Sequence, residues 1–193
     1  MTIWFLLFIP LMMLAAAFAV SQTQAVTGAD VDLQGALKSA VKAAALQVTV
    51  DSQANGIPRI GADTAHNAFR QKIAENLGLD AAMSPSPGSL LGWKPDYVLL
   101  VYNGDNTFFA GGAVSAYRYS FQDGVLTSGN LVLSGLPKTF RIIDNNIEVG
   151  VGGERDVTLD KPGVIAVINE KQIKIMGKEE MEITRWAAAK VVY

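Results

Sequence analysis

The chain has 193 residues, enough for one globular domain with an appendage; half of the residues are hydrophobic and 18% are charged. Its formal charge of −2 offers no basic stripe for phosphates, which argues against a nucleic-acid partner. It has no cysteine, which excludes disulfides, thiolate metal sites and covalently attached haem.

The chain opens with an apolar segment. Residues 1–26 contain no charged side chain. A secretory signal peptide would use this apolar core and a cleavage site at residues 17–19, but the basic residues that should precede the core are missing. A membrane anchor needs about 20 apolar residues, which residues 3–20 nearly supply. Its usual basic flank is also missing, because the first basic residue is Lys38.

A third interpretation joins this apolar segment to the residues after it in one helix. Apolar residues recur at spacings of three and four, which indicates one face of a helix: Val26, Ala29, Leu33, Leu37, Ala40, Val41, Ala44 and Val48. The pattern predicts a helix from about Thr2 to Val50, roughly 70 Å long. Its first half is wholly apolar and its second half amphipathic. The first half therefore needs lipid or copies of itself to cover it.

The stretch FLLFIPLMMLAAAFAV, followed by uncharged polar residues and an amphipathic helix, resembles the N-terminal segment of type IV pilin-like subunits, including the Tad-type pseudopilins. Pro10 is similar to the proline that those helices contain. The resemblance implies a removed leader peptide and a filament with the apolar helices in its core. Many such pilins have a glutamate at the fifth position of the mature chain, where this chain has Phe5 if Met1 is the mature terminus.

The function expected from this resemblance is that of a structural subunit of an extracellular surface filament, embedded in the inner membrane before assembly. Its expected partners are copies of itself and pilus assembly machinery, with no nucleic acid. The residues expected to pack in the filament core are Ile3, Trp4, Phe5, Leu6, Leu7, Phe8, Ile9, Leu11, Met12, Met13, Leu14 and Phe18. The alternative is a secreted or single-pass membrane-anchored β-rich binding module.

The next stretch, residues 51–61, contains Asn55-Gly56 and Pro58, which favour a break. A short helix is expected at 63–78. Asp63 or Thr64 would cap it and Gly78 would end it, with a buried stripe of Phe69, Ile73 and Leu77.

From residue 97 the pattern favours strands. The expected strand-forming runs are 97–103, 113–121, 125–133, 139–143, 146–151, 163–176 and 181–193, the last of them strand or partly helix through Trp186–Lys190. Turn residues stand between several runs: Asn103-Gly104, Asp123-Gly124 and Asp144-Asn145-Asn146. These runs predict a largely antiparallel sheet, with residues 33–50 and the 63–78 helix packed on it.

The predicted fold class is therefore α+β, with a long N-terminal helix and a C-terminal, largely antiparallel β-rich globular domain. The predicted domains are a helix over 1–52, whose residues 1–26 form the assembly or membrane segment, and a head over 53–193 with one short helix near 63–78.

No motif of an enzyme is found, and neither a cofactor nor a metal is expected. His66 is expected to be a solvated helix residue, because no nucleophile or acid accompanies it in a motif. The glycine-rich residues 149–156 lack the spacing of a phosphate loop and predict a hairpin or bulge. Residues 103–106 and 144–148 carry oxygen ligands suited to calcium, but turns are expected there. Glu179, Glu180 and Glu182 predict a solvated edge or hairpin.

Overall fold

The protein is seen in a computed structural model, which describes residues 2–87, 89, 91–107, 115–133, 135–173 and 180–192. Within the helices and strands, the side chains of residues 2–7, 19, 21–31, 171–173 and 180–182 lie outside the described part. The helices are α1 (Thr2–Ala45), α2 (Val50–Ala54) and α3 (Ala62–Leu77). The strands are β1 (Asp96–Tyr102), β2 (Ala116–Gln122), β3 (Val125–Leu131), β4 (Lys138–Ile143), β5 (Asn146–Val149), β6 (Arg155–Leu159), β7 (Gly163–Ile173) and β8 (Glu180–Lys190).

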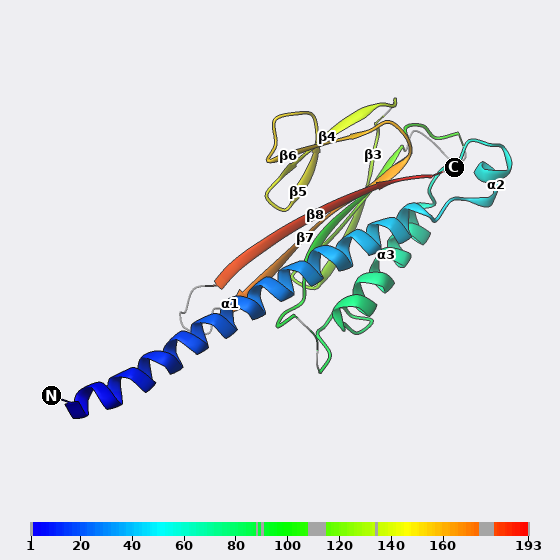
Figure 1. Ribbon diagram of the computed structural model, residues 1–193. Helices are drawn as coiled ribbons and strands as arrows, with labels where there is room; N and C mark the ends of the chain where they lie inside the picture. Colours follow the sequence, from blue (N-terminus) through cyan, green and yellow to red (C-terminus); the bar gives the residue numbers. More distant parts are fainter. Residues whose placement is uncertain are drawn as a thin grey trace.

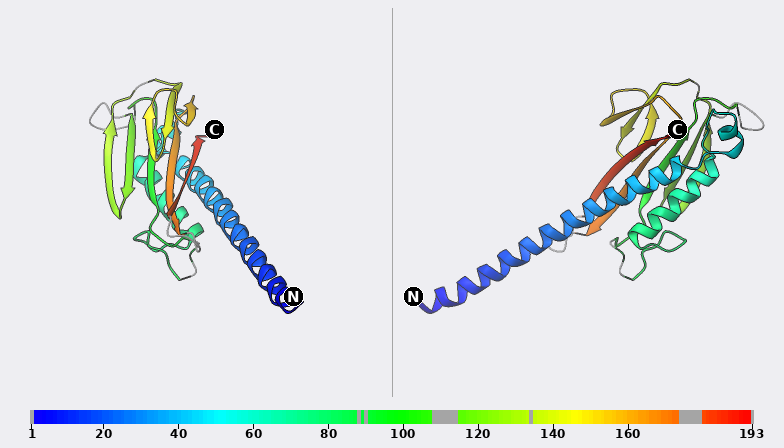
Figure 2. Two further views of the ribbon diagram at one scale, coloured as in Figure 1. Left: turned by 90° about the vertical axis from the view of Figure 1, so that its left-hand side faces the viewer. Right: turned by 45° about the vertical axis from the view of Figure 1, so that its right-hand side comes forward.

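The strands form two antiparallel sheets. The large sheet has the order β3-β2-β1-β7-β8, and the small sheet has the order β5-β4-β6. The C-terminal part of α1 and α3 lie on one face of the large sheet, and the small sheet lies on the other face (Figure 1). The N-terminal part of α1 extends away from this three-layered body (Figure 2).

The central strand β1 shows why both faces of the large sheet are apolar. Its side chains alternate between the two faces, so Leu99 points toward the helices and Leu100 toward the small sheet. Both are buried. A strand covered on both faces is an unbroken apolar run, which is what residues 97–102 are.

The helix-side core joins α1, α3 and the large sheet. In α1 its members recur at helical spacing from Leu33 to Ala45, and Leu37, Ala40, Val41 and Ala44 are fully buried. Lys38 and Lys42 on the opposite face are exposed. The amphipathic pattern over residues 33–44 therefore predicted the buried face, whereas Val26 and Ala29 lie outside the described side chains.

Two tight hairpins match the predicted turn residues. Gln122 pairs with Val125 across Asp123-Gly124, and Ile143 pairs with Asn146 across Asp144-Asn145. Asp123 and Asp144 both have a φ of 50°. Two-residue hairpins require positive φ values, and aspartate tolerates them better than most residues do.

The predicted fold class is wrong in its N-terminal helix. It required one helix to about Val50, but α1 ends at Ala45 and α2 is a separate helix. Val48 and Thr49 are β-branched and lie between the two helices, where Thr49 N donates to Arg59 O over 2.9 Å. In the apolar part, the described side chains cover only Phe8–Phe18 and Val20. The described part of the chain therefore does not support the long two-part helix.

Among the residues that the structure describes, no helix combines the length and the hydropathy needed to cross a membrane. The division into a helix domain over 1–52 and a head over 53–193 stays a prediction.

The predicted 63–78 helix is confirmed as α3, with Phe69, Ile73 and Leu77 buried and Gly78 left-handed at its end. The predicted cap is wrong. The N-cap residue is Gly61, and the Thr64 hydroxyl donates back to Gly61 O over 3.0 Å instead of capping the helix. The final segment is strand β8, including Trp186–Lys190, so the partly helical alternative is wrong.

Candidate functional site

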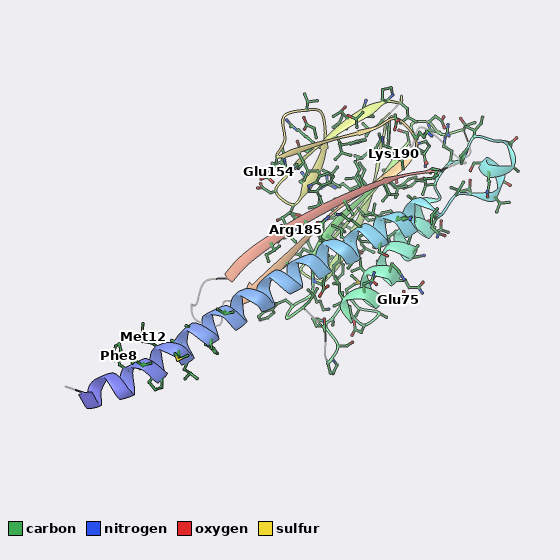
Figure 3. All side chains as sticks on the ribbon, viewed as in Figure 1. Phe8, Met12, Glu75, Glu154, Arg185 and Lys190 are labelled. Carbon is green, nitrogen blue, oxygen red and sulfur yellow. The ribbon has the colours of Figure 1, made fainter. Side chains whose placement is uncertain are left out.

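The apolar segment of α1 carries a group of exposed large side chains. Between Phe8 and Phe18 seven of them are 47% to 70% exposed: Phe8, Ile9, Leu11, Met12, Met13, Leu14 and Phe18. Figure 3 labels Phe8 and Met12 on the part of α1 that extends from the body. The other predicted core residues, Ile3, Trp4, Phe5, Leu6 and Leu7, have side chains outside the described part.

Exposure on every side of the helix distinguishes this segment from the rest of the chain. A helix on a protein surface normally exposes its polar face and buries its apolar one. Here Phe8, Leu11 and Leu14 are exposed together with Ile9 and Met13, which point in other directions around the helix. Single exposed apolar residues are common, but a continuous exposed group indicates a contact with a partner or lipid.

His66 is the centre of a buried polar cluster between α3 and the large sheet. Its Nε2 atom shares a 2.9 Å hydrogen bond with the Tyr97 hydroxyl on β1. Its ring stacks on Tyr119 of β2 with centroids 4.1 Å apart. The Tyr119 hydroxyl in turn donates to Asp63 Oδ1 over 2.9 Å. The expectation of a solvated histidine is therefore wrong.

The sequence contained a signal for this burial. His66 stands three and seven residues before Phe69 and Ile73, so it shares their face of α3. Burial, and secondarily the positive charge of Arg70, lowers the pKa of His66 to about 4, while Asp63 acts in the opposite direction. Burial also raises the pKa of both Tyr97 and Tyr119. The His66 ring and the two tyrosine hydroxyls are therefore neutral near pH 7.

The first candidate calcium segment, residues 103–106, binds other parts of the chain. Asn103 is buried and its carboxamide makes two hydrogen bonds to the backbone of Ile60, at 2.8 and 3.0 Å. The Asp105 carboxylate accepts two hydrogen bonds from the Arg59 guanidinium, one of them over 2.8 Å to Arg59 Nε. This contact lowers the pKa of Asp105. The segment therefore anchors the chain before α3 to the end of β1.

The second candidate calcium segment, residues 144–148, is likewise engaged. Asn146 Oδ1 accepts from Arg118, and Glu148 Oε2 accepts from Arg141 Nη2 over 2.7 Å. Among the described residues, no group of three or more histidine, aspartate or glutamate side chains is arranged to hold a metal ion. Glu179, Glu180 and Glu182 lie outside the described side chains.

The glycine-rich residues 149–156 connect β5 to β6, which lie on opposite sides of β4. The expected hairpin is therefore wrong, because β5 and β6 do not pair. Gly153 passes close to β4, where an added Cβ atom would lie 2.5 Å from Ile142 O. Glu154 N donates to the same oxygen over 2.8 Å. The glycine thus permits a backbone crossing rather than a ligand contact.

Two adjoining grooves are lined by residues of β8 and of the turns of the small sheet, and they share Glu154 and Thr184. The first, of about 850 Å³, has three basic residues among its lining, Lys38, Arg155 and Arg185. The second, of about 660 Å³, is lined by Trp93, Lys94, Asp96, Asp123, Asp144, Asn145, Glu154, Asn169 and Thr184. Figure 3 labels Glu154 and Arg185, which flank the first groove.

No protein-family model, no curated protein and no solved structure matches this chain.

Proposed function

We propose that this chain is the subunit of an extracellular surface filament and polymerises through the apolar segment of α1. The observation that carries the proposal is the exposure of seven large apolar side chains between Phe8 and Phe18. The segment resembles that of type IV pilin-like subunits in its layout. The expected partners are copies of this chain, the inner membrane before assembly and pilus assembly machinery.

The energy of burying these side chains is comparable to the cost of association. Burying one large apolar side chain contributes about 1.5–3 kcal/mol, so the seven described residues supply a gross stabilisation on the order of 10 kcal/mol. The cost of association is of similar size, about 4–15 kcal/mol. The sequence adds Ile3, Trp4, Phe5, Leu6 and Leu7 to the same segment, which would shift the balance toward assembly.

Met12→Asp tests the proposal in the native cells. A carboxylate within a packed apolar contact has a large desolvation cost, so we expect the surface filaments to disappear. The measurement is electron microscopy of the sheared surface fraction, with the subunit identified by the mass of its N-terminal peptide. Leu7→Asp is expected to have the same effect.

Val151→Asp is the matched control, because Val151 is 67% exposed and lies outside α1. Its filaments should be normal. Circular dichroism of both variants should show the strand content of the unaltered chain. Normal filaments from the Met12→Asp variant would contradict the proposal.

A second candidate function is a secreted or membrane-anchored binding module, which the two grooves beside β8 favour. Their linings provide charged and aromatic groups for a ligand. The same microscopy and mass measurement separates the two functions. A mature chain that begins near Val20, without filaments, would support the binding module.

A further inference from the structure

The two edges of the large sheet differ in how their backbone groups are protected. β3 forms one edge and β8 the other. The two-residue turn at Asp123-Gly124 makes Gln122 and Val125 a hydrogen-bonded pair, and such pairs alternate along antiparallel strands. Following this alternation across the sheet, the N–H and C=O groups that point outward belong to alternate residues of each edge: Leu126, Ser128 and Asn130 in β3, and Thr184, Trp186 and Ala188 in β8.

Two of the outward carbonyl groups of β8 accept hydrogen bonds from side chains. Gln34 Nε2 of α1 donates to Trp186 O over 3.2 Å, and Arg185 Nη1 donates to Thr184 O over 2.8 Å. Lys190 at the end of the strand forms a 2.6 Å ion pair with Asp160. α1 also packs against β8. Proteins use covering elements and charged side chains in this way to prevent edge-to-edge pairing.

Among the residues that the structure describes, β3 has neither of these protections. Its seven residues, VLTSGNL, include neither a charged residue nor a proline, and the first six are exposed. Among the described residues, the outward backbone groups of Leu126, Ser128 and Asn130 have no hydrogen-bond partner. Backbone groups in an uncharged, exposed edge are a template for another strand.

We propose that β3 pairs antiparallel with β3 of a second copy of this chain, about a two-fold axis at Ser128. In this register Ser128 faces Ser128 of the copy, and Leu126 faces Asn130. All three outward-pointing residues then form hydrogen-bonded pairs, and the two large sheets become one. A second copy fits because β3 brings no like charges together across the axis, as a charged edge would.

This contact is distinct from the filament contact of α1 and does not depend on it. A two-fold interface closes on itself and does not propagate. It joins two chains or, where filaments form, two neighbouring filaments. A single strand pair is a small interface, so its occupancy rises where many copies are held close together.

Cysteine cross-linking tests the register, because the chain has no cysteine of its own. Hydrogen-bonded antiparallel partners have Cα atoms about 5.5 Å apart, a separation that a disulfide spans. The full-length Ser128→Cys variant in detergent should therefore form covalent dimers under mild oxidation. In the Asn130→Cys variant the two cysteines would lie roughly 14 Å apart along the strands, so dimers should form at least about tenfold more slowly.

A mixture provides the second measurement. Leu126→Cys chains mixed with Asn130→Cys chains should yield the mixed dimer in preference to either homodimer, because these positions face each other. Non-reducing gel electrophoresis over time follows all three variants. Equal dimer formation by Ser128→Cys and Asn130→Cys, or absence of the mixed dimer, would overturn the proposal. Repeating the test in Met12→Asp chains separates its outcome from that of the filament proposal.

Discussion

The two faces of the large sheet are both buried, but they are covered differently. The helix-side face packs against α1 and α3 and contains the polar cluster of His66, Tyr97, Tyr119 and Asp63. The other face packs against the small sheet through apolar residues such as Leu100, which alternates with Leu99 along β1. The difference shows that one strand can serve a core that contains a buried histidine and a second core whose described members are apolar residues and Tyr102.

The largest effect is expected where a charge enters the helix-side core. Ala40 of α1 is fully buried. Ala40→Asp would bury a carboxylate among apolar side chains, and we expect it to lower the free energy of unfolding by about 3–5 kcal/mol or to prevent folding. Thermal unfolding followed by circular dichroism measures this.

Lys38→Asp is the control, since Lys38 lies two residues earlier on the exposed face of the same helix. Its unfolding temperature should stay close to that of the unaltered chain. If both aspartates were tolerated equally, α1 would not be a cover of the large sheet.

Two buried phenylalanines, one on each side of the large sheet, allow the two packed faces to be compared directly. Phe69 of α3 and Phe140 of β4 are both buried, one on each side of the large sheet. Either Phe→Ala change should cost about 3–5 kcal/mol. We expect Phe69→Ala to destabilise the whole molecule, because α3 packs against α1, which contacts β7 and β8.

Phe140→Ala should act mainly on the small sheet. β4 is its central strand, so its opening would expose the amides of β5 and β6 as well. Native-state hydrogen exchange of the backbone amides distinguishes local opening of the small sheet from unfolding of the whole molecule. Protection should fall in β4, β5 and β6 and persist in β1 and β7. Uniform loss of protection in this variant would mean that the two faces form one cooperative unit.

Much of this arrangement could be predicted from local patterns in the sequence. Alternation and β-branched residues identified most strands, and Asp123-Gly124 identified a tight hairpin. The spacing of Phe69, Ile73 and Leu77 identified the buried face of α3. These are local properties of backbone conformation and side-chain periodicity.

The failures concern pairing between distant segments. Strand β6, RDVTL, was not predicted, because its charged start hides a short strand. The glycine-rich connection predicted a hairpin or bulge because strands flank it, but a hairpin is wrong because both neighbours pair with β4. The expectation for His66 was wrong because its partners on β1 and β2 lie far away in the sequence. For the candidate assembly residues, the sequence showed that the segment is apolar. The structure adds that the large apolar side chains between Phe8 and Phe18 are exposed.

Acid provides the last and smallest test, because it should act on only one of the two cores. His66 has a pKa of about 4 in the folded chain and about 6.5 when unfolded. Between these values the unfolded state binds more protons, so stability is complete above about pH 6.5 and declines as the pH falls toward 4. The shift corresponds to roughly 3 kcal/mol as an upper limit. His66→Gln should remove this part of the pH dependence.

The comparison requires urea unfolding of both proteins at several pH values between 7 and 4. Carboxylates titrate in the same range, so the relevant quantity is the difference in slope between the unaltered chain and the His66→Gln variant. Asp63 and Arg70 of α3, with Tyr97 and Tyr119 of the sheet, are the groups around His66, and they are the same in both proteins. Equal slopes would show that His66 is not the titratable centre of the helix-side core. A steeper slope in the unaltered chain would assign its acid sensitivity to that face of the sheet.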